Sequence, residues 1–121
     1  MTVLAIIPDL IFSTKVFSTA KDLGVSIQGA RTLEVVAQRL TDPELRLVLI
    51  DLGASTLDPL AAIRLIRETP KPPRIICFVS HVETELAAAA RAAGADLVLA
   101  RSQFSSQLPS LLQAAGESTI P

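Results

Sequence analysis

The stretch "LVLIDLGASTLDP", Leu47–Pro59, decides the fold class of this chain of 121 residues. Its first four residues are apolar without interruption, as in strands of parallel sheets that are covered on both faces. The run ends on one carboxylate, Asp51, and the dipeptide Asp58-Pro59 then supplies an N-cap and a first-turn proline for a helix. The stretch therefore predicts a buried strand that carries an acid to the edge of a sheet, followed by a helix.

The same alternation of strand and helix extends in both directions along the chain. Apolar runs predict strands at residues 2–7, 25–28, 46–50, 74–79 and 96–100. The second of these, "VSIQ", alternates apolar with polar residues, which is typical of a half-exposed edge strand. Segments with helical spacing follow each run and include apolar positions at Phe12, Leu33, Leu60, Leu86 and Phe104. Five such repeats indicate a three-layer α/β fold with a five-stranded parallel sheet.

Two helix ends have clear local signals. Thr32 stands just before an apolar-periodic segment, where its hydroxyl would cap a helix. Gly94 follows an alanine-rich segment, where a glycine commonly ends a helix.

The composition excludes several classes of function. The net charge is -1 and neither Trp nor Tyr occurs, which argues against nucleic-acid binding. The single cysteine, Cys77, cannot form an internal disulfide, and no apolar stretch reaches the roughly 20 residues of a membrane span. The chain opens without the basic segment of a signal peptide. We therefore expect a cytoplasmic protein with no membrane or nucleic-acid partner.

Motifs of the common enzyme classes are missing from the sequence. No dinucleotide-binding, P-loop, serine-hydrolase or thiol-redox motif occurs, and no Cys/His cluster could hold zinc. The only histidine, His81, is interpreted as an exposed loop residue. We expect no catalytic residues and no enzyme activity.

Chemistry-bearing residues nevertheless follow four of the five predicted strands at their carboxyl ends. Asp9 follows the first strand, Asp51 the third, Ser80 the fourth and Arg101 the fifth. This edge of an open parallel sheet is where ligands bind. An acid pair there can hold a hard divalent cation such as Mg²⁺, and a hydroxyl with a guanidinium can bind phosphoryl oxygens.

On these residues the chain resembles a response-regulator receiver domain, the CheY-like class, from about Val3 to Leu112. Receivers carry an acid pair after the first strand, a phosphoacceptor aspartate ending the third, a Thr or Ser ending the fourth and a Lys ending the fifth. The corresponding stretches here read "IIPD", "LVLID", "FVS" and "LVLAR". The resemblance implies a flavodoxin-like sheet with strand order 2-1-3-4-5.

It also implies roles for particular residues. Asp51 corresponds to the phosphoacceptor, and Ser80 and Arg101 to the residues that contact the phosphoryl group. Asp9, Asp51 and Gly53 are the candidate ligands of Mg²⁺.

Four departures from the family pattern affect this machinery together. Pro8 replaces the first acid, so Mg²⁺ binding is expected to be weak or absent. Arg101 replaces the lysine with a wider, planar cation. Ser102 replaces the proline that follows the lysine, and Val98 stands where the family has its switch Tyr or Phe. The resemblance is therefore to an atypical receiver or pseudo-receiver.

Simpler roles stay open for each site residue. Asp51 could be an inherited acid that serves solubility or hydrogen bonds to its loop, and Asp9 a solvated loop acid. Ser80 could cap the next helix or turn. Arg101 could form a permanent ion pair with Asp51, in place of metal and phosphate.

The leading hypothesis is a two-component signalling module, residues 1–115 with a flexible tail at 116–121, in which phosphorylation of Asp51 is weak or absent. Its expected partners are a histidine kinase or a downstream signalling protein. A homodimer through the last two helices and the fifth strand is a further expectation. One alternative is a functional phosphoacceptor receiver with Arg101 in the lysine's place. Another is a flavodoxin-like domain that binds an anionic small ligand at the same edge.

Overall fold

The structure is a computed structural model that describes residues 1–54, 56–82 and 84–117, the last two by their backbone only. Strands and helices alternate along the whole described chain. The strands are β1 (Thr2–Ile6), β2 (Ser26–Gly29), β3 (Leu45–Asp51), β4 (Arg74–Val79) and β5 (Leu97–Ala100). The helices are α1 (Leu10–Asp22), α2 (Leu33–Arg39), α3 (Pro59–Arg67), α4 (Glu85–Ala93) and α5 (Arg101–Glu117).

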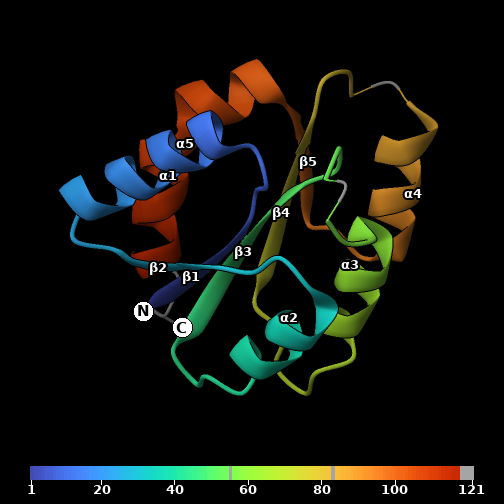
Figure 1. Cartoon of the computed structure of the whole chain (residues 1–121), viewed down its shortest axis with the longest axis horizontal. Helices are drawn as coiled ribbons and strands as arrows, with labels where there is room; N and C mark the ends of the chain where they lie inside the picture. Colours follow the sequence, from blue (N-terminus) through green and yellow to red (C-terminus); the bar gives the residue numbers. More distant parts are fainter. Residues whose placement is uncertain (55, 83, 118–121) are drawn as a thin grey trace.

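The five strands form one parallel sheet in the order β2-β1-β3-β4-β5, as the resemblance implied. Helices α1 and α5 cover one face and α2, α3 and α4 cover the other, which gives three layers (Figure 1). The segment predicted to be an edge strand is β2, and β2 lies at one edge of the sheet. The predicted fold class is confirmed.

Strand β3 lies at the centre of the sheet and explains the apolar run with which the sequence analysis began. From Leu47 to Ile50 its residues are at most 1% exposed, because the helices bury both of its faces. Burying a Leu, Ile or Val side chain fully contributes about 1.5–3 kcal/mol relative to leaving it exposed. This burial fixes β3 in position and with it the acid at its end, Asp51.

The predicted helix ends are confirmed where the structure describes them. The Asp58 carboxylate accepts from the backbone N–H groups of Leu60 and Ala61 at the start of α3, with Pro59 in the first turn. The Thr32 hydroxyl caps α2, and Gly94 ends α4 with a φ of 124°, a backbone conformation that favours glycine.

Helix α5 differs from the expectation at both of its ends. Its apolar pattern starts at Phe104, but the helix begins at Arg101, directly after β5. A proline at position 102 would disfavour helical backbone at the residue before it, whereas Ser102 permits it. The helix continues to Glu117, beyond the predicted domain boundary at residue 115. Residues 118–121 of the predicted tail lie outside the described residues, so the tail stays a prediction.

Within the part of the chain that the structure describes, every helix is too short or too polar to cross a membrane.

Candidate functional site

Asp51 lies at the carboxyl end of β3 and is the one buried polar or charged residue among those that the structure describes, with 7% of its surface exposed. One carboxylate oxygen, Oδ1, accepts a hydrogen bond of 2.8 Å from the backbone N–H of Gly53. Gly53, one of the candidate Mg²⁺ ligands, thus contacts Asp51 through its backbone N–H, and its role toward a metal stays a prediction. The other oxygen, Oδ2, faces across the sheet edge.

Asp9 is the N-cap of α1, a role that the sequence analysis did not anticipate. Its Oδ1 accepts from the backbone N–H groups of Ile11 at 3.0 Å and Phe12 at 3.2 Å. The Phe12 N–H, followed by the Arg101 guanidinium and the Ile11 N–H, holds the pKa of Asp9 below its ordinary value of 3.8. Asp9 is exposed, as the alternative of a solvated loop acid supposed, but its carboxylate also caps the first turn of α1.

Arg101 joins these two acids. Its Nη1 lies 3.4 Å from Asp9 Oδ2, and its Nη2 lies 3.3 Å from Asp51 Oδ2. The two nitrogens of one planar fork thus each contact a different carboxylate, a geometry that the single ammonium of a lysine does not offer. The ion pair between Arg101 and Asp51, one of the alternatives left open above, is present, and Asp9 shares it.

An aromatic platform lies beneath this guanidinium. Arg101 Cζ is 4.7 Å from the ring centroid of Phe12 and 5.6 Å from that of Phe78, within the range of cation–π attraction. The Phe78 ring stacks on Phe104 at 4.4 Å and meets Phe12 edge-on at 5.1 Å. Three of the four phenylalanines of the chain thus support the charged cluster.

The sequence analysis gave Phe12 and Phe104 as apolar positions of two predicted helices without relating them to Arg101. A signal was available in the spacing. Phe12 follows Asp9, and Phe104 follows Arg101, by three residues, which is about one helical turn. Two rings one turn into helices that start at the site would be expected to lie beside it.

The arrangement does not fit the Mg²⁺ site that the resemblance implies. Each carboxylate has one oxygen bound to backbone N–H and the other to Arg101, so the guanidinium occupies the space between the two acids. Among the described residues no group of three or more acidic, His or Cys side chains is placed to hold a metal ion. A divalent cation would have to displace a cation that the protein carries itself.

Ser80 lies at the same edge. It lines a cleft of about 330 Å³ together with Asp51, Gly53, Val79 and Arg101. Thr84, and not Ser80, is the N-cap of α4, so the helix-capping alternative for Ser80 is wrong. His81 lines a neighbouring hollow with Ser80, outside the residues that surround Asp51, and its side chain is exposed.

Comparison with known proteins places the fold in a structural class. No protein-family model matches the chain, and no curated protein matches it. Among solved structures it is similar to the receiver domain of the sensor histidine kinase PA1611 from Pseudomonas aeruginosa PAO1, which has a magnesium ion in its active-site cleft. That match has a TM-score of 0.80 and 19% identity and covers 95% of this chain and 97% of that one.

Two further matches extend the comparison. A receiver domain of the Francisella response regulator 1452 matches with a TM-score of 0.80 and 15% identity, over 98% of both chains. A Burkholderia pseudomallei response regulator, which has a phosphorylated aspartic acid, a calcium ion and citrate, matches with a TM-score of 0.72 and 20% identity. That match covers 99% of this chain and 75% of the other. At these identities the likeness establishes the fold, and the fold is that of response-regulator receiver domains.

Proposed function

We propose that this chain is a two-component signalling module, an atypical receiver that acts by contacting other proteins and whose Asp51 is phosphorylated weakly or not at all. The observation that carries the proposal is the Arg101 guanidinium bound to both Asp9 and Asp51. The receiver fold, shared with solved response-regulator domains over nearly the whole chain, supports the signalling class.

The charge of the cluster supports weak phosphorylation. Two carboxylates and one guanidinium already leave one negative charge in excess. Phosphorylation would replace the single negative charge of the Asp51 carboxylate with a phosphoryl group of about 1.5–2 negative charges at neutral pH, so the excess negative charge would grow. The similar structures from Pseudomonas and Burkholderia have a divalent metal ion in addition to their protein groups. Here Arg101 would have to leave Asp9 and Asp51 before such an ion could bind.

Val98 supports the same proposal from β5. It is 7% exposed and packs in the core beneath α3 and α4, where a small aliphatic side chain has no ring to move between a buried and an exposed rotamer. A signal that began at Asp51 would find no aromatic switch at this position. We therefore propose that the module is read in one conformation.

The partners that follow from this function are proteins: a histidine kinase or a downstream signalling protein. The surface of α4, β5 and α5 is the proposed site of pairing or docking, and a homodimer through it is part of the proposal.

Beryllofluoride with Mg²⁺ imitates a phosphorylated aspartate and provides the test. We expect the amide spectrum of the wild-type chain to show no saturable, Asp51-dependent change at Gly53 or Ser80 when beryllofluoride and Mg²⁺ are added. The double variant Pro8→Asp/Arg101→Lys restores the acid and the lysine of the family pattern, and we expect it to respond. Asp51→Asn in each background is the matched control, and the amide spectrum without ligand checks that each variant is folded.

A tight, Asp51-dependent response of the wild-type chain would overturn the proposal and favour the alternative of a functional phosphoacceptor. The alternative of an anionic small ligand has a different outcome. It predicts that a phosphate-bearing compound raises the melting temperature without Mg²⁺, and that Arg101→Ala removes this rise. The excess negative charge of the cluster disfavours that alternative.

A further inference from the structure

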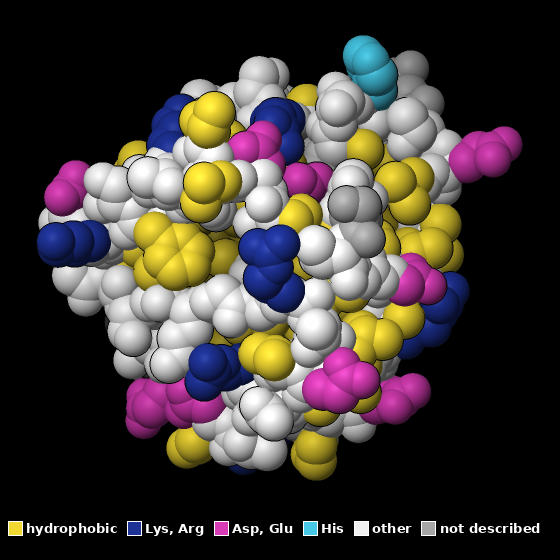
Figure 2. Space-filling model, viewed as in Figure 1, with side chains coloured by type: hydrophobic (Ala, Val, Ile, Leu, Met, Phe, Trp, Pro, Cys, Tyr) yellow, Lys and Arg dark blue, Asp and Glu magenta, His cyan; other side chains and the backbone are white. Residues whose placement is uncertain are grey.

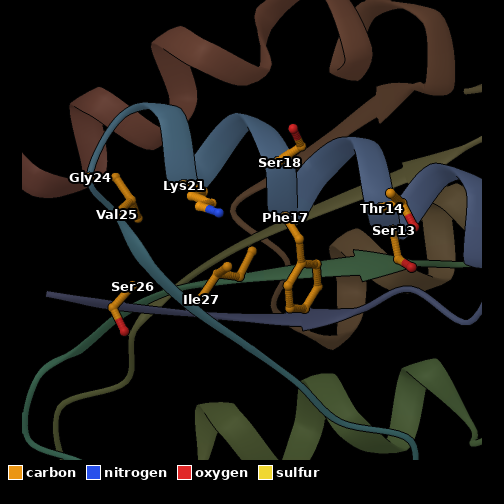
Figure 3. A pocket seen from close by; sticks show the side chains of 9 residues that line it. All are labelled: Ser13, Thr14, Phe17, Ser18, Lys21, Gly24, Val25, Ser26 and Ile27. Carbon is orange, nitrogen blue, oxygen red and sulfur yellow. The ribbon is translucent and has the colours of Figure 1, made fainter.

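A groove runs between α1 and the edge strand β2, on the side of the sheet away from β5. It has a volume of about 970 Å³, and its lining is apolar at Phe17, Val25 and Ile27. Figure 3 shows Phe17 pointing from α1 toward the strands and Ile27 pointing from β2 toward α1. All three side chains are half-buried and pack against the aromatic face of the core. The groove is therefore an apolar surface that the described chain only partly covers.

The backbone of β2 is open along the same groove. Ala30 N–H donates to Ala5 C=O, and Ala5 pairs with Gly29 in the parallel register. In this register the peptide groups of Gln28 and Ala30 point toward β1, so those of Ile27 and Gly29 point outward. No described residue hydrogen-bonds with these outward groups. Two N–H donors and two C=O acceptors thus form an exposed sheet edge.

One charged side chain lines the groove beside this edge. Lys21 lines the groove from α1 and is exposed, and it makes no ion pair with any described residue. It is the only charged residue in the lining. An occupant that complements the groove therefore has an apolar side chain for Phe17 and Ile27 and a carboxylate for Lys21.

The dimensions fit a short extended segment. The groove follows α1 from Ser13 to Lys21, which is about 12 Å at 1.5 Å per residue. About four residues of an extended strand cover the same distance at roughly 3.3 Å each. A second copy of this chain fits less well, because the segment that it would contribute, Ser26–Gly29, has no carboxylate to offer Lys21.

We propose that the groove between α1 and β2 binds an extended acidic-apolar peptide segment of another protein, which adds to the sheet as a sixth strand beside β2. The backbone groups of Ile27 and Gly29 supply the hydrogen bonds, and the groove selects the side chains, as in other cases of strand addition. This surface is separate from the Asp51 cluster, so the proposal stands whether or not Asp51 is phosphorylated.

The test uses the full chain, labelled with ¹⁵N, and the synthetic peptide acetyl-Glu-Val-Thr-Val-Glu-amide at up to millimolar concentration. We expect saturable shifts of the Ile27 and Gly29 amide signals and slower hydrogen exchange at both. The same peptide with alternate backbone nitrogens methylated keeps its side chains but loses donors for one edge, and we expect no binding of it to β2.

Two variants examine the contributions of backbone and charge. Gly29→Pro removes an outward N–H, which an edge strand tolerates, and Gly29 has no positive φ that proline could not adopt. We expect it to raise the peptide Kd more than tenfold. Lys21→Gln removes the ammonium, and we expect a rise of about threefold, as for an exposed ion pair. Lys71→Gln, an exposed lysine outside the groove, is the matched control and is expected to leave the Kd unchanged.

Three results would overturn the proposal. One is an absence of shifts at Ile27 and Gly29 with millimolar peptide. Another is equal binding of the methylated peptide, which would mean an apolar pocket without strand addition. The third is shifts that depend on protein concentration alone, which would mean that a second copy occupies the edge. Beryllofluoride binding is read from the amide signals of Gly53 and Ser80, and peptide binding from those of Ile27 and Gly29. Failure of one proposal is therefore distinguishable from failure of the other.

Discussion

The two ends of α1 serve two surfaces of opposite character. At its N-terminus, Asp9 and Phe12 belong to a cluster in which each carboxylate oxygen has a partner and the single cation contacts two acids. Toward its C-terminus, Phe17 and Lys21 line a groove whose backbone edge and ammonium have no partner in the described chain. Figure 2 shows apolar side chains at the surface in the region of α1 and β2, in contact with solvent.

The difference teaches that the site expected from a resemblance is not always the surface whose groups are free to bind another molecule. The cluster at the sheet edge contains the residues that chemistry would single out, but they satisfy one another. The groove contains a phenylalanine, a lysine and an edge strand, none of which is notable alone. What a surface leaves unpaired is the better guide to what it can bind.

The largest expected effect separates the two surfaces by their contribution to stability. Phe78→Ala removes the fully buried ring at the centre of the aromatic platform, and we expect the free energy of unfolding to fall by about 3–5 kcal/mol. Phe17→Ala removes a half-buried ring of the groove, and we expect a loss of about 1–2 kcal/mol. Urea unfolding measures both. Equal losses would mean that the groove is part of the core in the same sense as the cluster.

A smaller effect is expected from the two cations. Arg101→Ala leaves two carboxylates facing each other, one of them buried, and we expect a loss of about 1–2 kcal/mol. Asp51→Asn added to Arg101→Ala relieves the repulsion, so the double variant is expected to regain part of the loss. Lys21→Ala, which breaks no ion pair, is expected to change stability by less than about 0.5 kcal/mol. A loss at Lys21 as large as that at Arg101 would contradict the contrast drawn above.

The smallest effect concerns acid. The lowered pKa of Asp9 means that its ionised form is favoured by folding, so this stability is fully present above the ordinary value of 3.8 and is lost as the pH falls through the lowered pKa. Asp9→Asn keeps a good capping side chain without the charge. We therefore expect the wild type to lose stability relative to Asp9→Asn as the pH falls below 3.8. In the Arg101→Ala background this relative loss is expected to shrink, and thermal unfolding across acidic pH measures both differences.

The fold could be predicted from the sequence because burial dictates its pattern. An uninterrupted short apolar run such as Leu47–Ile50 favours a strand covered on both faces, and Asp58-Pro59 indicates a helix start by local chemistry alone. The meeting of Asp9, Asp51 and Arg101 at one edge followed from the parallel sheet. In each case the deciding interaction lies within one element or follows from the order of the strands.

The details of both surfaces depend on contacts between elements, which periodicity does not contain. The bond of Arg101 to two acids depends on the direction of its side chain from the first turn of α5, over rings from α1 and β4. The edge character of β2 could be predicted from "VSIQ", but the groove also needs Phe17 and Lys21 on the facing helix. Their placement depends on how α1 crosses the sheet.

Helix α5 begins at the residue after β5 ends, with no loop between them. Strand β5, Arg101 and the first part of the 17-residue helix are therefore continuous, and that part, from Arg101 to Pro109, is about 12 Å long at 1.5 Å per residue. A loop at this junction would absorb a displacement of Arg101 locally. The helix instead carries it from Arg101 as far as Pro109, where the missing N–H permits a bend, so a partner that pulls Arg101 away from Asp51 would have to tilt the first half of α5. The junction therefore restricts the movement of Arg101, in addition to the ion pairs with Asp9 and Asp51 that hold its guanidinium.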